Sequence, residues 1–200
     1  GGRGRGSPVG GQNGLHKARG GSTDPERRGG GGAKLGIKFA RGENVTKKNG
    51  NSDGTRYPQT RRGVGAIIRD RFLAAQDYAK GRTAAERSGT PFRRDLELEP
   101  IAEILAGDRL IHCHSYRQDE ILMLCDIARA FGFTIGSFQH VLEGYKVAEH
   151  IREASLGGSA FSDWWAFKVE VQDAIPQNGP IMHEAGVTVS FNSDSDDLVR

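Results

Sequence analysis

The segment LIHCHS, residues 110–115, holds two histidines that are separated by one residue. Side chains at positions i and i+2 of a strand point to the same face, so His112 and His114 would lie together and Cys113 on the opposite face. Neutral imidazole nitrogen is a common zinc ligand. A histidine at a strand end is more often structural than a metal ligand, so this pair alone leaves both interpretations open.

Polar side chains also follow three later apolar segments. His140 comes after FTIGSF, Asp163 follows GSAFS, and Asp194 comes shortly after VTVSF. Imidazoles from neighbouring strands, together with a carboxylate, can form a metal site. The sequence therefore predicts that His112, His114, His140 and Asp194 meet at one edge of a sheet.

The elements that would position these residues alternate between strand and helix patterns. Apolar segments near 110–114, 134–138, 159–162 and 187–191 predict strands, and helical patterns over 96–107, 118–132 and 143–154 lie among them. An amphipathic pattern over 63–81 predicts an earlier helix. Such alternation indicates βαβ units and a parallel sheet. The carboxyl ends of parallel strands share one edge, where α/β folds keep their sites.

Charge and glycine are unevenly distributed along the 200 residues. Residues 1–100 hold 21 Lys and Arg against 10 Asp and Glu, whereas residues 101–200 hold 7 against 15. Residues 1–33 contain 13 of the 29 glycines and no aromatic residue, which predicts a poorly ordered segment before a folded domain over 34–200. Its Arg-Gly pairs suggest RNA binding as an alternative function, although the segment lacks the aromatic residues that stack on bases in such segments.

Composition also bears on compartment and partners. The chain has no run of 18 apolar residues, so we expect no membrane span and no membrane partner. Two cysteines, Cys113 and Cys125, are too few for a disulfide framework and favour free thiols in a reducing compartment such as the cytoplasm. The chain opens without Met and without a signal-peptide pattern.

Several motifs together resemble the amidohydrolase superfamily, in the branch related to imidazolonepropionase. They are LIHCHS, FQHVLEGYKVA, FSDWWAFK and AGVTVSFNSDS, with GIKFARGENV, RYPQTRRGV and the glycine-rich VGGQNGLHKARGG upstream. The resemblance implies a metal-dependent hydrolase on a (β/α)₈ barrel. Such an enzyme would cleave carbon–nitrogen bonds of a small-molecule or short-peptide amide. Its cofactor would be one or two divalent metal ions, with zinc as the first candidate.

The resemblance also implies roles for individual residues. His112 and His140 match metal-binding histidines at the ends of barrel strands five and six, and His114 matches a second histidine beside the first. Asp194 resembles the strand-eight aspartate, which contacts metal and accepts a proton from the attacking water. Lys38, in IKFARGEN, resembles the strand-four lysine that bridges metal ions as a carbamate in some members.

The chain departs from the family pattern at both ends. The first HxH motif of the family has no counterpart, and the sequence starts roughly at strand three and stops after strand eight. Its 200 residues are fewer than the ~250 of a typical complete barrel. We therefore expect an incomplete (β/α)₈ barrel that lacks its first strands and last helix. An inert fragment that shares the fold but not the activity is the alternative.

Overall fold

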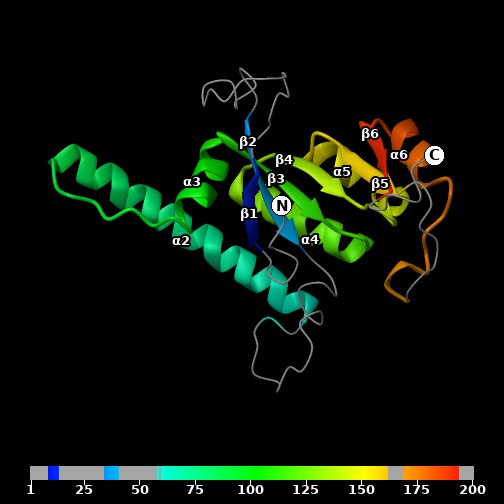
Figure 1. The fold of residues 1–200 in the computed structure, drawn as a ribbon, viewed down its shortest axis with the longest axis horizontal. Coiled ribbons are helices and arrows are strands. Elements are labelled where there is room, and N and C mark those ends of the chain that lie inside the picture. The colour runs from blue at the N-terminus through cyan, green and yellow to red at the C-terminus, as the bar shows by residue number, and fades with distance from the viewer. Residues whose placement is uncertain (1–8, 14–33, 41–57, 59, 162–168, 194–200) are drawn as a thin grey trace, which may run out of the picture.

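A computed structural model describes residues 9–13, 34–40, 58, 60–161 and 169–193 (Figure 1). Its centre is a six-stranded sheet in the order β1-β2-β3-β4-β5-β6. The strands are β1 (Val9–Asn13), β2 (Leu35–Ala40), β3 (Arg109–His114), β4 (Ile135–Gln139), β5 (Gly158–Phe161) and β6 (Val189–Asn192). β1 pairs with β2 in antiparallel fashion, and β2 to β6 are parallel. The chain thus has an α/β fold with a parallel sheet of five strands.

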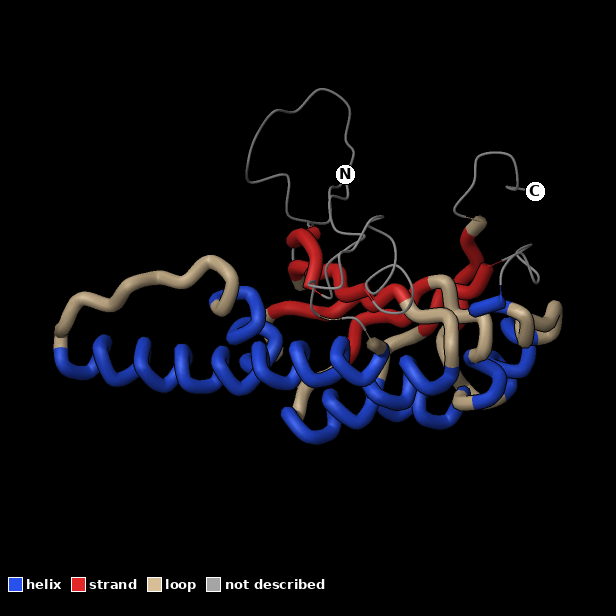
Figure 2. The backbone as a smooth tube through the Cα atoms, turned by 90° about the horizontal axis from the view of Figure 1, so that it is seen from below, coloured by secondary structure: helices blue, strands red, loops and turns tan. Residues whose placement is uncertain are grey.

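Helices occupy the connections between the parallel strands. They are α2 (Arg61–Ser88), α3 (Glu99–Ala106), α4 (Gln118–Phe131), α5 (Ala148–Ala154) and α6 (Asn178–Glu184), with short 3₁₀ helices η2 (Gly144–Lys146) and η3 (Val169–Val171). Seen from the side, the α-helices lie on one side of the sheet (Figure 2). None of the described helices is long and apolar enough to cross a membrane.

The predicted parallel strands are confirmed, with ends that differ by a few residues from those expected. The helix expected over 63–81 was predicted too short, because α2 runs from Arg61 to Ser88. The polar segment after residue 81 includes Ala84 and Ala85, which favour helix strongly. The helix ends at Gly89, which adopts the left-handed conformation that glycine tolerates best, with φ 67°.

The glycine-rich segment is described only in part. Residues 9–13 form β1, whose pairing with β2 the sequence analysis did not anticipate. The other residues of 1–33 lie outside the described residues, so poor order in that segment stays a prediction.

The core lies between the sheet and the helices. Phe72 of α2 is fully buried, and its ring centroid lies 6.2 Å from that of Phe39 in β2 and 4.8 Å from that of Phe133. Ile111 and Cys113 of β3 belong to the same cluster. Alternate residues of each strand therefore face the helices, and the residues between them face the other side of the sheet.

That other face carries polar side chains. The register places Lys38 of β2 beside His112 of β3, and His112 beside Ser137 of β4. Two residues further on, His114 lies beside Gln139. Parallel sheets usually have both faces covered. A polar face that lies away from the α-helices is therefore the natural place in this fold for a functional site.

Candidate active site

His114 and His140 lie together at the carboxyl edge of the parallel sheet. β3 ends at His114, and His140 follows the last residue of β4. Their ring centroids are 5.0 Å apart and the rings are inclined at 62°. Tyr116 packs against His114 at 4.5 Å, and Phe161 packs against His140 at 4.7 Å. The fold therefore brings together two of the predicted site residues, whose role as metal ligands stays a prediction.

His140 has an unusual backbone conformation. Its φ of 61° is positive, and no other non-glycine residue in the described part of the chain shares this property. The left-handed conformation costs an L-residue roughly 1–2 kcal/mol. The ring is held by stacking on Phe161 and by a hydrogen bond between Nδ1 and Oδ1 of Asn192 at 3.1 Å. Strained residues cluster at functional sites, so this outlier favours a role for the His140 ring.

His112 lies two residues before His114 on the same face of β3. Its Nδ1 is 2.8 Å from the hydroxyl oxygen of Ser137. Burial lowers the pKa of His112 below its ordinary value of 6.5, which favours the neutral ring. A neutral imidazole is the form that binds a metal ion.

Gly136 makes room for the His112 ring. A β-bulge falls here, because Ile111 pairs with Ile135 whereas His112 pairs with Ser137, which leaves Gly136 between them. A Cβ atom added to Gly136 would lie 3.1 Å from Cε1 of His112 and 2.9 Å from Cβ of Leu110. Sequence reasoning missed this residue, although a glycine inside a strand pattern often marks a close approach.

Of the two remaining predicted site residues, the structure describes Lys38 but not Asp194. Lys38 is half-buried and in register with His112, so it lies on the same polar face. Asp194 lies outside the described residues, as does Asp163. Ser193, which precedes Asp194, is buried directly after the last residue of β6.

The residues present can supply part of a metal site. Among the described residues, no group of three or more His, Cys, Asp or Glu is arranged to hold a metal ion. The paired rings of His114 and His140 fit the imidazole donors that zinc prefers. Catalytic zinc sites commonly have three protein ligands and a water, so a carboxylate such as Asp194 would be needed beside them.

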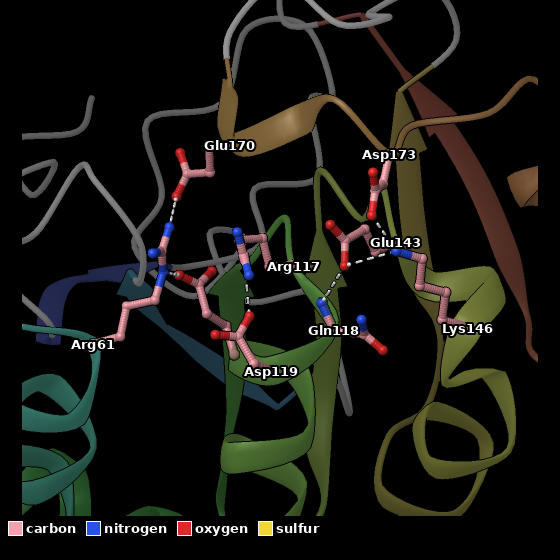
Figure 3. A network of polar contacts seen from close by, with 9 residues as sticks. Arg61, Arg117, Gln118, Asp119, Glu143, Lys146, Glu170 and Asp173 are labelled. Carbon is pink, nitrogen blue, oxygen red and sulfur yellow. Dashed lines mark hydrogen bonds and ion pairs between the residues drawn. The ribbon is translucent and has the colours of Figure 1, made fainter.

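An ion network ties the elements around this edge together (Figure 3). Arg61, at the start of α2, donates to Glu120 of α4 at 2.8 Å and to Glu170 of η3 at 3.1 Å. Both glutamate side chains are only 1% exposed. Burial alone would lower the pKa of Arg61, but the two carboxylates raise it above the ordinary value. The sequence offered no spacing signal for this network, because its members are 59 and 109 residues apart.

Glu143 connects two other elements near the same edge. Its carboxylate accepts a hydrogen bond from the backbone N–H of Gln118 at 3.0 Å and so caps α4, as Figure 3 shows. Lys146 lies 3.6 Å from that carboxylate and 2.5 Å from Asp173. An acid at a helix N-terminus stabilises it through the free N–H groups and the helix dipole. The segment between β4 and α5 is thereby fixed to the start of α4.

Comparison with known proteins connects this geometry to a class of enzymes. No protein-family model matches the chain. Amidohydrolase tasK of Hapsidospora irregularis is 25% identical over 173 residues, which are 80% of this chain and 17% of that protein. The solved structure of an amidohydrolase from Thermotoga maritima MSB8 matches with a TM-score of 0.81 and 28% identity, over 96% of this chain and 49% of that one. The chain thus spans about half of the solved structure and a smaller share of tasK. Both of these similar proteins are described as amidohydrolases.

Proposed function

We propose that the chain is part of a metal-dependent hydrolase that cleaves carbon–nitrogen bonds in amides or cyclic amides. The observation that carries the proposal is the pairing of His114 and His140, 5.0 Å apart, at the carboxyl edge of a parallel sheet. The sheet belongs to a fold similar to that of a solved amidohydrolase. The motif resemblance adds the imidazolonepropionase-related branch to the proposal.

We further propose that the fold is an incomplete (β/α)₈ barrel. Five parallel strands follow one another in chain order, with α-helices on one side of the sheet (Figure 2). Polar residues such as Lys38 and His112, which are in register, lie on the other face. In the wall of a barrel, helices form the outer layer and the carboxyl ends of the strands carry the site, so this arrangement supports the proposal. A chain that matches 49% of a complete amidohydrolase structure agrees with such a part.

In this proposal, His112, His114, His140 and Asp194 bind one or two divalent ions, zinc in first place, and Lys38 is a candidate bridging ligand. A bound ion would lower the pKa of its water to about 7 and polarise the amide carbonyl. The carboxylate of Asp194 would accept the proton of the water as it attacks. Burial lowers the pKa of His112 and so favours the neutral ring that this role needs. The lysine stands beside it on the same face.

The test uses the full-length protein. Its zinc content is measured after loading and dialysis, and hydrolysis is followed with a cyclic amide, a dipeptide and an N-acyl amino acid. Asp194→Asn should keep the metal, since the amide retains an oxygen, and should lower the rate about 10²–10⁴-fold through loss of the base. Asp173→Asn is the matched control, because this carboxylate pairs with Lys146 outside the proposed site.

Three results would count against the proposal. A protein that retains no divalent metal after loading would exclude a metal-dependent reaction. Full activity of Asp194→Asn with metal bound would remove Asp194 as the base. A protein that binds metal but cleaves none of the amides would favour the inert alternative.

A further inference from the structure

We infer that Asn192 is a positioning residue, which fixes the proton of the neutral His140 ring on Nδ1 and so puts its lone pair on Nε2. The inference rests on the proposed function for its purpose, but the hydrogen-bond geometry carries it. Asn192 ends β6, two strands away from β4, which leads into His140, and β5 lies between them (Figure 1).

The orientation of the Asn192 amide follows from its neighbours. Its Nδ2 lies 2.6 Å from the hydroxyl oxygen of Ser159 and 3.3 Å from the carbonyl oxygen of Ala160. A carbonyl oxygen can only accept a hydrogen bond, so the NH₂ group must face Ala160. A flipped amide would place two oxygens against each other. The amide oxygen of Asn192 therefore faces His140.

The tautomer of His140 follows from that orientation. An amide oxygen can only accept, so the Nδ1 atom that lies 3.1 Å from it must carry a proton. In a neutral imidazole with the proton on Nδ1, the free lone pair is on Nε2. Histidines that bind metal commonly donate their other N–H to an acceptor, which holds the ring and sets the tautomer.

His112 shows by contrast that this restriction is specific. The partner of its Nδ1 is the hydroxyl of Ser137, which can either donate or accept. Neither tautomer of His112 is therefore imposed by this contact. Only at His140, among these two rings, does the partner have a single hydrogen-bonding role. Ser159 acts one step further away, because it holds the Asn192 NH₂ group in place.

The test reads the tautomer directly. Full-length protein is labelled with ¹⁵N-histidine, stripped of metal, and studied by long-range ¹H–¹⁵N NMR at a pH where the rings are neutral. His140→Gln assigns the signals of His140. We expect the Nδ1–H tautomer in the wild-type protein and its loss in Asn192→Leu, which keeps the bulk without the acceptor. Asn192→Asp loses the two contacts of the NH₂ group but retains an acceptor oxygen for Nδ1, so the proton on Nδ1 of His140 should persist in this variant.

Zinc affinity of the same three proteins provides the second readout. Loss of such a supporting contact typically lowers metal affinity 10–100-fold, so we expect this loss in Asn192→Leu and substantial recovery in Asn192→Asp. An Nε2–H signal for His140 in the wild-type protein, or an unchanged signal in Asn192→Leu, would overturn the inference even if the protein binds zinc and hydrolyses amides. The expected tautomers in a protein that binds no zinc would support the positioning contact and count against the proposed function.

Discussion

Gly136→Ala should destabilise the protein and disturb His112, and the structure allows the effect to be estimated. The added Cβ would lie 2.9 Å from Cβ of Leu110, at least about 0.6 Å closer than an ordinary carbon contact. It would also lie 3.1 Å from the backbone oxygen of Ile111, which cannot rotate away. Overpacking of this kind costs about 1–3 kcal/mol. Displacement of the His112 ring from Ser137 would add about 0.5–1.5 kcal/mol.

A smaller term opposes this loss. Replacing glycine by alanine reduces the conformational entropy of the unfolded chain, which is worth about 0.4–1 kcal/mol. The net expectation is a fall of about 0.5–4 kcal/mol in the free energy of unfolding, measured by denaturant titration. If His112 binds zinc as proposed, zinc affinity should fall as well, because the His112 ring would have to move.

Gly158→Ala is the matched control. Gly158 is also a buried glycine in a central parallel strand, but a Cβ there would meet only Val141 and Val187, at 3.9 Å and 4.0 Å. Those are ordinary contacts, so this variant should be neutral or stabilised by up to about 1 kcal/mol. If Gly136→Ala were as stable as Gly158→Ala, the close approach to His112 would not be the reason for glycine at this position.

Three other predictions follow from the buried charged and titratable groups. Arg61→Met should lower the free energy of unfolding by about 3 kcal/mol, because it removes the guanidinium that two buried glutamates share; the value is at the low end for a broken buried ion pair since the Arg61 side chain is 35% exposed. Arg62→Met, at an exposed residue, is the control, and equal effects of the two variants in denaturant titrations would contradict the reasoning. The pKa of His112 is below 6.5 in the folded protein and about 6.5 in the unfolded chain. Between these two pKa values the unfolded chain binds more protons, so the free energy of unfolding decreases as the pH falls below 6.5. His112→Gln should reduce that loss in unfolding curves of metal-free protein from about pH 5 to about pH 8. Burial raises the pKa of Cys125 to about 12, so thiol labelling at about pH 8, read by mass spectrometry, should require unfolding.

Local patterns predicted the regular part of the fold. The segment with His112 and His114 forms β3, and the segments before His140 and Asn192 form β4 and β6. Short apolar runs that alternate with amphipathic helices leave few arrangements other than a parallel sheet. The same rule placed His114 and His140 at one edge, because parallel strands carry their carboxyl ends together.

The missed features depend on contacts between distant segments. Arg61 bonds to residues 59 and 109 positions away, and no short-range pattern encodes such a network. Asn192 looked like an ordinary polar residue after a strand, and its importance appears only when β6 lies beside β5 and the amide reaches His140. The end of α2 was missed because the residues after position 81 are mostly polar and were not read as helix, although their composition favours a helix.

The strained backbone of His140 indicates which part of this edge is held most firmly. A left-handed histidine costs roughly 1–2 kcal/mol, and that cost persists only where surrounding contacts enforce it. The enforcing contacts are the hydrogen bond to Asn192 and the stack on Phe161, which belong to β6 and β5. A hydrogen bond contributes about 0.5–1.5 kcal/mol and an aromatic contact a similar amount, so together they can offset the strain. The ring position of His140 therefore depends on three neighbouring strands at once, which is the preorganisation that its proposed role as a metal ligand requires.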